Sequence, residues 1–416
     1  MATPTRERAF AIVGAGQAGA WVARTLRAEG FEGRIVLIGR EPHWPYERPP
    51  LSKAVLTGAA QCVDATLLTA AQADELAIEA WLDDSAVSID LEARRLTCRS
   101  GRALAYETLF LTTGAMPRRP PWLPTQASPA IHLLRTADDA MRLQAALARI
   151  GRLLVVGGGW IGLEVAATAR SLGLEVTLLE MGERLCARST PPVVSDYLRD
   201  LHEGHGVRVL LGAQGRELAA CPDAVALTLA DGRRLEADAL VVGIGIAPDT
   251  QLAEACGLDV ADGVLVDAAG RTSDPHVFAA GDVARQRNGA AVGARLESWF
   301  NAQAQAIVAA KAALGAPDLY SDVPWAWSDQ YDVGLQMVGA PERASDVALR
   351  LEAAGGGRCW LALDAAGRPL GAVAANAPRE LRVIRKALQT GAAVPARAWM
   401  DPAKPLASLA IPRGAS

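Results

Sequence analysis

The feature that most constrains the fold of this chain is a glycine-rich turn that occurs twice. The first copy spans residues 14–19 (GAGQAG) and follows an apolar strand predicted over 10–13. The second spans 157–162 (GGGWIG) and follows a strand predicted over 153–156. A helical pattern follows each turn, and a strand, turn and helix in this order are typical of a dinucleotide-binding βαβ unit. The sequence therefore predicts an α/β protein with two nucleotide sites.

The three glycines of the first turn each have a physical purpose. Gly14 permits a tight turn, Gly16 leaves the backbone open to a pyrophosphate, and Gly19 lets the helix pack close to the strand. The helix N-terminus adds free N–H groups and a positive dipole end. The corresponding residues of the second turn are Gly157, Gly159 and Gly162. Two such sites in one chain favour a flavin that exchanges electrons with a nicotinamide.

The strand after the second turn carries a specificity signal. This strand, predicted over 175–179, ends in Glu180. A carboxylate at that place can accept hydrogen bonds from a ribose 2′-OH and repels a 2′-phosphate, so we expect NADH in preference to NADPH. Arg184 and Arg188 follow closely and could instead favour a phosphate. The strictness of this preference therefore stays open.

Length and composition set the broad class. The 416 residues are too many for one compact core and suit two or three domains. Half of the residues are hydrophobic and 21% are charged, and the net charge of −4 gives no general affinity for nucleic acid or membranes. The N-terminus has no signal-peptide pattern, and no apolar run reaches the roughly 18 residues of a spanning helix. We expect a cytoplasmic protein.

The cysteines exclude one class of flavin enzyme. Six of them are scattered along the chain with no C-x-x-C pair, so no redox-active disulfide of the thioredoxin-reductase kind is encoded. Five isolated histidines form no metal-ligand pattern with them. His202 and His205 are close in sequence, but we predict that they mark a solvated helix end. No metal site is expected.

A segment after the first βαβ unit supports a specific resemblance. Residues 45–53 (PYERPPLSK) lie one strand after the N-terminal glycine turn. With that turn they resemble the putidaredoxin-reductase-like flavoproteins, the FAD-dependent NADH:ferredoxin reductases that serve bacterial Rieske dioxygenases and cytochromes P450. This family belongs to the glutathione-reductase structural class, and the resemblance covers essentially the whole chain.

Two further segments carry the same resemblance and imply the domain organisation. Residues 272–282 resemble the second FAD fingerprint of the class, whose strand delivers Asp282 to the ribitol chain. Residues 325–330 (WAWSDQ) resemble a marker in which Trp327 lies against flavin and nicotinamide. The implied fold is glutathione-reductase-like, with an FAD domain of 1–117 and 248–320, an NAD domain of 118–247 and an α+β C-terminal domain of 321–416.

The resemblance implies an electrostatic role for a lysine–glutamate pair. Arg48 and Lys53 match cations that contact the flavin, and a cation near its reactive edge suits the negative charge of the reduced ring. Glu164 matches a glutamate that pairs with Lys53, and it lies in an apolar stretch where a carboxylate needs a partner. The residues expected at the hydride-transfer site are therefore Lys53, Glu164 and Trp327.

One position departs from the family pattern. Many relatives place a carboxylate at the position of Arg40 to hold the adenosine ribose, whereas here the acid is Glu41. Glu41 can take over that contact, or backbone and water can hold the ribose. The other cofactor contacts that the resemblance implies are Ala18, Ala86, Thr113, Gly114, Arg135, Gly281 and Trp299 for FAD, and Ile161 and Gly245 for NAD.

The implied activity is electron transfer. NADH donates hydride to FAD, and electrons then pass singly to a [2Fe–2S] ferredoxin that feeds an oxygenase, with no side chain acting as acid, base or nucleophile. Alternatives are rubredoxin or a small molecule as acceptor, or a redox sensor resembling apoptosis-inducing factor. A monomer and a homodimer are both open.

A basic helix is a candidate docking surface for an acidic ferredoxin. The pattern from Pro378 to Lys386 is helical and brings Arg379, Arg382 and Lys386 to one side. Arg118 and Arg119 could extend this surface. A solvated helix face is the alternative interpretation.

Five stretches complete the coarse prediction of secondary structure. Residues 62–83 have a helical, alanine-rich pattern, and 94–104 are predicted to form a hairpin that turns at Ser100 and Gly101. A helix is predicted to begin at Arg295. Alternating stretches over 333–338 and 359–363 predict a small antiparallel sheet in the C-terminal region.

Overall fold

A computed structural model describes residues 9–288, 291–316, 319–320, 322–352, 356–390, 396–401, 403–404 and 406. The chain divides into two compact units. The described residues of the first unit come from Met1–Pro49, Gln61–Met116 and Ile246–Asp322, and those of the second come from Pro50–Ala60, Pro117–Gly245 and Val323–Ser416. Each unit is described by itself below.

A parallel five-stranded sheet forms the centre of the first unit. Its order is β19-β7-β1-β2-β3, and every neighbouring pair is parallel. The first predicted βαβ unit is confirmed, because α1 (Gln17–Ala28) connects β1 to β2. The strands are β1 (Ala9–Val13), β2 (Arg34–Ile38), β3 (Ile78–Trp81), β7 (Thr108–Leu111) and β19 (Val277–Ala279).

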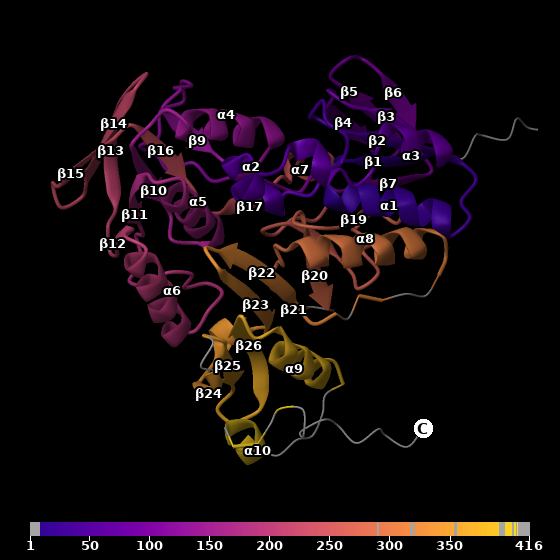
Figure 1. The fold of residues 1–416 in the computed structure, drawn as a ribbon. Helices are drawn as coiled ribbons and strands as arrows, with labels where there is room; N and C mark the ends of the chain where they lie inside the picture. Colours follow the sequence, from indigo (N-terminus) through magenta and orange to yellow (C-terminus); the bar gives the residue numbers. More distant parts are fainter. Residues whose placement is uncertain are drawn as a thin grey trace, which may run out of the picture. The chain divides into compact units, whose positions relative to one another are not determined.

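One face of this sheet is covered by α1 and α8 (Trp299–Ala313), which lie side by side (Figure 1). Alanines dominate the buried face of α8, so its backbone can approach α1 closely. The core between them and the sheet contains Phe10, Leu26 and Phe110. Burying this apolar face is what stabilises helices of this length in a folded domain.

The helical prediction for residues 62–83 is wrong in its second half. That stretch contains only two short helical segments, η2 (Cys62–Ala65) and α3 (Ala70–Glu75), and then the edge strand β3. Ala77 adopts a left-handed conformation with φ of 47°, which ends the helix. Ile78 and Trp81 are then buried while Glu79 is exposed, so burial against β2 overrides the alanine-rich composition.

Smaller sheets complete the first unit. The hairpin prediction is confirmed by β5 (Arg95–Cys98) and β6 (Ala103–Ala105), and Gly101 between them has φ of 87°. The strand β4 (Ala86–Asp90) pairs with β5. The remaining elements of the unit are β18 (Val264–Val266), β20 (Ala284–Asn288), β21 (Ala291–Val292), α7 (Gln251–Ala255) and, towards its boundaries, β8 (Ala115–Pro117) and β17 (Ile246–Pro248).

The second unit contains the second βαβ unit, again as predicted. A parallel sheet has the order β12-β11-β10-β16-β9, and α5 (Trp160–Ser171) connects β10 to β11. The strands are β9 (Ile131–Leu133), β10 (Arg152–Val156), β11 (Glu175–Leu179), β12 (Arg208–Leu210) and β16 (Ala239–Val242). Other elements of this part are η1 (Pro49–Ser52), α2 (Ala54–Thr57), α4 (Ala137–Leu147), α6 (Pro192–Gly204), β13 (Gly215–Cys221), β14 (Ala224–Leu229) and β15 (Arg234–Ala237).

The C-terminal part of the second unit is the predicted antiparallel sheet. Its order is β22-β23-β26-β25-β24, and α9 (Pro378–Thr390) packs on β23 and β26 (Figure 1). The α+β character expected for this region is confirmed. The elements are β22 (Trp325–Gln330), β23 (Val333–Gly339), η3 (Pro341–Arg343), β24 (Asp346–Glu352), β25 (Arg358–Leu363), β26 (Pro369–Ala375) and α10 (Ala396–Met400).

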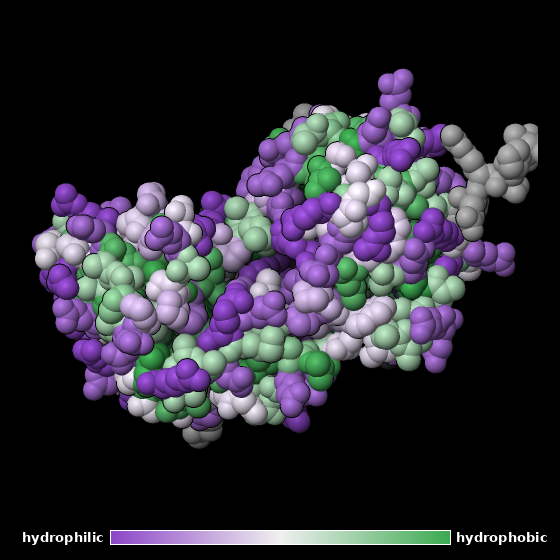
Figure 2. Space-filling view, turned by 90° about the horizontal axis from the view of Figure 1, so that it is seen from above, coloured by the Kyte–Doolittle hydropathy of each residue, from purple (hydrophilic) through white to green (hydrophobic). Residues whose placement is uncertain are grey.

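The surface is mixed in character. On the face drawn in Figure 2, hydrophilic residues are interspersed with small groups of hydrophobic ones. Exposed large hydrophobic side chains such as Val63 and Met181 are widely separated in sequence, which is normal for folded proteins. None of the helices named above has the length and apolar character needed to cross a membrane.

Candidate functional site

The first glycine turn combines two crowded positions with one open position. Gly14 has φ of 118°, and a Cβ atom there would lie 2.1 Å from the Thr112 carbonyl oxygen. A Cβ on Gly19 would lie 1.9 Å from the Gly14 oxygen. Gly16 differs, because no other described atom lies within 4 Å of its Cβ position. The crowded glycines fix the turn, and the open one leaves room for a ligand.

The residue after the open glycine supports a ligand at this turn. Gln17 is the first residue of α1, and both polar atoms of its side-chain amide are buried. Among the described residues they have no hydrogen-bond partner. A buried amide without a partner costs free energy, and a bound polar group would remove that cost. The turn therefore fits the pyrophosphate of a dinucleotide, which would also receive the first N–H groups of α1.

The structure brings the second fingerprint to this turn. Gly281 has φ of 82°, and a Cβ there would lie 3.1 Å from the Cβ of Ala18. The Gly281 N–H donates to Gln305, 2.9 Å away. Asp282 is the next residue, so its backbone lies beside the start of α1. This geometry suits a carboxylate that accepts from a sugar-alcohol chain.

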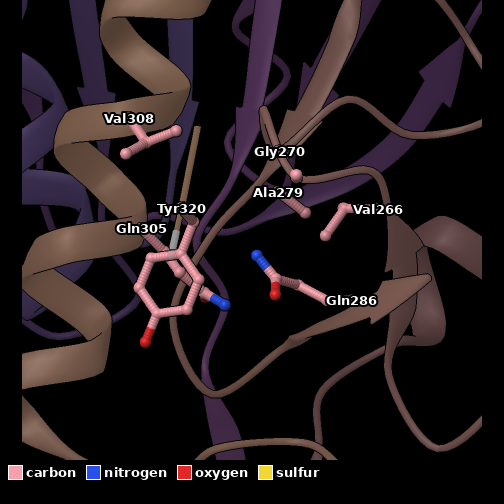
Figure 3. Close-up of a pocket in the computed structure, with 8 residues that line it drawn as sticks. Val266, Gly270, Ala279, Gln286, Gln305, Val308 and Tyr320 are labelled. Atoms are coloured by element: carbon pink, nitrogen blue, oxygen red, sulfur yellow. The ribbon is translucent and has the colours of Figure 1, made fainter. Parts of the chain in front are cut away.

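A small hollow lined by Gln305 belongs to core packing. Figure 3 shows Gln286 and Tyr320 near Gln305, which extends from α8. The space among these side chains leaves no volume for a ligand. Since Gln305 accepts from the Gly281 N–H, this glutamine holds the backbone of the fingerprint segment in place.

Glu41 and Arg48 are joined to each other. The Arg48 guanidinium donates to Glu41 at 2.9 Å, and the Tyr46 hydroxyl donates to the same carboxylate at 2.5 Å. Burial of Arg48 disfavours its charge, but Tyr46 and Glu41 outweigh that effect and raise its pKa. Arg40, in contrast, reaches Asp249 at 3.4 Å and is exposed. Glu41, one position after Arg40, is therefore the acid that pairs with Arg48, a residue expected to contact the flavin.

The other residues expected around FAD in the first unit lie at element ends. Ala86 begins β4, and the Thr113 hydroxyl donates to the Asp249 carbonyl at 2.7 Å, next to Gly114. The expected start of α8 at Arg295 is wrong by four residues. The helix begins at Trp299 because the Ser298 side chain accepts from the Asn301 N–H as an N-cap.

The second glycine turn has the same arrangement as the first, with two crowded glycines and one open glycine. Gly157 has φ of 114°, and a Cβ there would lie 2.3 Å from the Gly243 oxygen. A Cβ on Gly162 would lie 1.9 Å from the Gly157 oxygen. Gly159 has no described neighbour within 4 Å of its Cβ position. Two residues later on α5, the apolar side chain of Ile161 is 43% exposed.

The Glu180 carboxylate is held at this turn by backbone. It accepts from the N–H groups of Gly158 and Gly182, each at 2.7 Å. Arg184 points away into its own loop, where it donates to the Thr190 carbonyl at 2.6 Å and to Ser195 at 2.9 Å. A Cβ on Gly245 would lie 2.9 Å from an Arg188 nitrogen. Of the two arginines that could favour a phosphate, Arg188 is therefore the one that lies beside Gly245, a residue expected to contact NAD.

Lys53 and Glu164 meet in the second unit. The Lys53 ammonium lies 2.8 Å from Glu164 on α5, and the Ser52 hydroxyl donates to the same carboxylate oxygen. The other oxygen accepts from Ser328 at 2.6 Å. Glu164 is buried, and three donors compensate its charge. Arg135, also expected near FAD, precedes α4 in this unit, where its backbone N–H donates to Asp139.

Trp327 lies on a strand with two different faces. On β22 its ring stacks on Trp325, with ring centroids 5.2 Å apart and an angle of 24° between the planes. Ser328 and Gln330 alternate with the tryptophans, so they point to the opposite face, and both are buried. The strand thus presents aromatic rings on one side and hydrogen-bonding groups on the other.

The prediction for His202 is wrong, whereas His205 is exposed as predicted. His202 is fully buried in α6. Its Nε2 lies 2.8 Å from the Gln330 side-chain oxygen, and its Nδ1 lies 3.1 Å from the Tyr331 hydroxyl. Sequence spacing could not reveal this contact, because Gln330 lies 128 residues away. In the part of the chain that the structure describes, no group of three acidic, histidine or cysteine residues could hold a metal.

The buried histidine leads to a pH prediction. Burial lowers the pKa of His202 to about 4; the Gln330 hydrogen bond opposes this effect and His205 adds to it. Below about pH 6.5 the unfolded state binds a proton that the folded state does not, so stability falls as the pH falls towards 4, by at most about 3 kcal/mol. In a series of melting temperatures across this window, His202→Gln should flatten the slope. His132, whose pKa burial also lowers, contributes equally to both proteins. Parallel slopes would exclude His202 as the source.

The basic helix is confirmed as α9, with its charged side outward. Arg379, Arg382 and Lys386 are exposed, while Leu381 and Ile384 are buried. The buried residues fix the helix on the sheet, and its other side exposes three positive charges to solvent.

Comparisons with known proteins agree with this geometry. Residues 8–306 match the family described as pyridine nucleotide-disulphide oxidoreductase, and residues 325–410 match one described as reductase C-terminal. The chain is 40% identical over 402 residues to the ferredoxin–NAD(+) reductase component of the p-cumate 2,3-dioxygenase system of Pseudomonas putida, covering 96% of this chain and 98% of the relative.

Two further proteins are similar over most of their length. The ferredoxin–NAD(+) reductase component of the anthranilate 1,2-dioxygenase system of Burkholderia cepacia is 40% identical, with 94% of this chain and 97% of the relative covered. Among solved structures, the covalent putidaredoxin reductase–putidaredoxin complex matches with a TM-score of 0.92 and 35% identity, covering 97% of this chain and 98% of that chain.

Proposed function

Because the chain belongs to the pyridine nucleotide-disulphide oxidoreductase family, we propose that it is an FAD-dependent NADH:ferredoxin reductase that supplies an oxygenase. The observation that carries this proposal is the pair of glycine turns, each with crowded glycines around one open position. A dioxygenase-system reductase at 40% identity over nearly the whole chain supports the choice of acceptor. The division into FAD, NAD and C-terminal domains is part of the proposal.

The first turn would hold FAD and the second would hold NADH. On the first unit, Gly16 and Gln17 would receive the pyrophosphate, and Asp282 the ribitol chain. On the second, Gly159 would face the pyrophosphate of NADH and Glu180 its ribose. Bound FAD supplies the chemistry that converts a two-electron hydride donor into a source of single electrons.

The side chains near the reacting rings would act by charge and by shape. We assign Lys53 a contact with the flavin, where its positive charge stabilises the electron-rich reduced ring. Glu164 fixes the direction of the Lys53 side chain. Trp327, supported by its stack on Trp325, would orient the nicotinamide. These are electrostatic and positioning roles, and none of them requires proton transfer from a side chain.

Replacing Glu180 tests the assignment of the NADH ribose. We expect Glu180→Ala to lower kcat/KM for NADH about tenfold, since a charged hydrogen-bond acceptor is lost, and to raise it for NADPH. Arg184 is held by the Thr190 carbonyl and Ser195, so a gain with NADPH would have to come from Arg188 alone and should be small. Steady-state kinetics with both cofactors measure the ratio. Glu183→Ala, at an exposed neighbour, is the control. An unchanged NADH/NADPH ratio in Glu180→Ala would remove this assignment.

Charge reversal on α9 tests the docking surface. The double variant Arg382→Glu, Lys386→Glu should raise KM for the ferredoxin about tenfold at low ionic strength, and the difference should shrink as salt screens it. Arg234→Glu reverses an exposed charge on β15 and serves as the control. Reduction of ferricyanide by NADH should not change. Equal KM values for the double variant and the wild type at low salt would show that another surface docks the ferredoxin.

The function itself is tested by NADH-driven reduction of cytochrome c, with and without an added [2Fe–2S] ferredoxin, and with NADPH in place of NADH. A rate that depends strongly on ferredoxin and on NADH is the expected result. If NADH reduces the bound flavin but no ferredoxin accelerates turnover, the acceptor assignment is wrong and small acceptors become the subject of the next assay.

A further inference from the structure

A chain of side-chain hydrogen bonds runs through the second unit to the Glu164 carboxylate. It starts at the Tyr331 hydroxyl, which lies 3.1 Å from His202 Nδ1. His202 Nε2 lies 2.8 Å from Gln330 Oε1, and Gln330 Nε2 donates to the Ser328 hydroxyl at 3.0 Å. Ser328 then donates to Glu164 at 2.6 Å. The chain therefore ends at the carboxylate that pairs with Lys53.

The members of this chain are buried and come from distant segments. His202 and Ser328 are 0% exposed, Gln330 is 1% exposed and Glu164 is 3% exposed. They lie on α6, β22 and α5, so no single element brings them together. Each buried polar group would cost free energy without a partner, and here each one has a partner on both sides.

The direction of every hydrogen bond follows from the chemistry of the groups. Gln330 Oε1 can only accept, so His202 Nε2 carries the proton. Neutral His202 then accepts at Nδ1, and the Tyr331 hydroxyl must donate to it. Because Gln330 donates to Ser328, the serine hydroxyl is free to donate to Glu164. All the bonds thus point towards the carboxylate.

Gln330 is the residue on which this direction depends. Like His202, it accepts through one atom and donates through another, and its amide couples His202 to Ser328. With the amide reversed, Ser328 would donate to Gln330 Oε1, and Glu164 would lose that donor. A carboxylate with one donor fewer attracts the Lys53 ammonium more strongly and screens more of its positive charge.

We propose that Gln330 is a positioning residue that acts through Ser328 and Glu164 to set the direction and effective charge of Lys53. The proposal rests on the proposed function in one respect, the contact of Lys53 with the flavin. Lys53 and Tyr331, the two ends of the chain, also line one cavity of about 200 Å³, together with Thr57, Ser171 and Asp329. A cavity-lining residue outside the chain is therefore available as a matched control.

The test compares Gln330→Leu with Asp329→Asn in the flavin-loaded enzyme. Asp329 is adjacent to Gln330, lines the cavity and is exposed. Leucine removes the Gln330 donor, so Ser328 still donates to Glu164 but the bond loses the polarisation that Gln330 provides and weakens. We expect Gln330→Leu to slow flavin reduction at saturating NADH about fivefold, to leave the dissociation constant of NADH within about twofold, and to shift the flavin midpoint potential to more negative values. Asp329→Asn should change none of these quantities.

A double-mutant cycle with Lys53→Met separates positioning from general structural damage. If Gln330 acts through Lys53, adding Gln330→Leu to Lys53→Met should change the rate less than about twofold and leave the potential where Lys53→Met puts it. Equal effects of Gln330→Leu in both backgrounds would overturn the proposal. A Lys53→Met single variant with unchanged rate and potential would instead overturn the flavin contact of the proposed function.

Tyr331→Phe provides a second route if Gln330→Leu does not fold. It removes the hydroxyl donor at the start of the chain and retains the ring, which stacks on His205 with centroids 3.7 Å apart. We expect the same shift in potential at a smaller size, again absent in the Lys53→Met background. A potential equal to that of the wild type would contradict the proposal.

Discussion

Valine at position 16 should abolish FAD binding, whereas valine at position 159 should abolish NADH binding and retain the flavin. Both glycines are in extended conformations that valine adopts readily, with φ of −102° at Gly16 and −85° at Gly159. Neither Cβ position has a described neighbour within 4 Å, so the substitution places its first side-chain atom in open space on the side where the ligand would lie. We expect each affinity to fall at least about 100-fold, or roughly 2.7 kcal/mol. Flavin absorbance and NADH titration measure the two affinities.

Substitutions at the crowded glycines are the control for these two valine variants. Gly14→Ala and Gly157→Ala place a Cβ within 2.3 Å of a backbone oxygen at positive φ, so both should lower the melting temperature of the ligand-free protein. Gly16→Val and Gly159→Val should not lower it. If Gly16→Val bound FAD normally, or if Gly159→Val lost FAD but retained NADH, the assignment of the two turns would have to be revised.

Lys53→Met is expected to produce the largest change at the reacting rings. It removes the cation from a buried ion pair and leaves Glu164 with its two serine donors, which costs about 3 kcal/mol of stability, the low end of the usual range because Lys53 is partly exposed. If the lysine charge stabilises the reduced flavin, the hydride-transfer rate should fall about 100-fold, equal to roughly 2.7 kcal/mol. Stopped-flow reduction by NADH measures this rate.

A second variant separates the two effects. Lys53→Met with Glu164→Gln leaves no unpaired charge at the buried site, so it should recover much of the lost stability. The hydride-transfer rate should stay low, because the cation is still absent. A rate that recovered together with the melting temperature would mean that Lys53 acts on folding and not on the flavin.

Local patterns predicted most of the fold. The two βαβ units follow from apolar strands, glycine spacing and helical periodicity, all of which act within about thirty residues. The edge strand β3 escaped prediction because its four residues follow an alanine-rich stretch, and only pairing with β2 buries Ile78 and Trp81. The start of α8 depended on a serine N-cap, which the match to a family pattern does not locate.

Most of the hydrogen-bond chain from Tyr331 to Glu164, in contrast, could not be predicted from local patterns. Glu164 could be singled out from its apolar neighbours, and the resemblance supplied Lys53 as its partner. Nothing in the spacing of His202 indicated burial, because its partners Gln330 and Tyr331 belong to a strand end that is distant in sequence. Long-range side-chain contacts of this kind are set by tertiary packing, which periodicity does not report.

The two faces of β22 restrict how the C-terminal part of such a protein can be exchanged. A chimera that takes this part from a relative, in order to change the electron acceptor, would also replace Ser328 and Gln330. Those residues bond to Glu164 and His202, which the recipient sequence contributes. Inserting or deleting one residue in the strand would turn the tryptophans towards α5 and the polar groups away from it. A working exchange must therefore transfer the strand in register and with both of its partner residues matched.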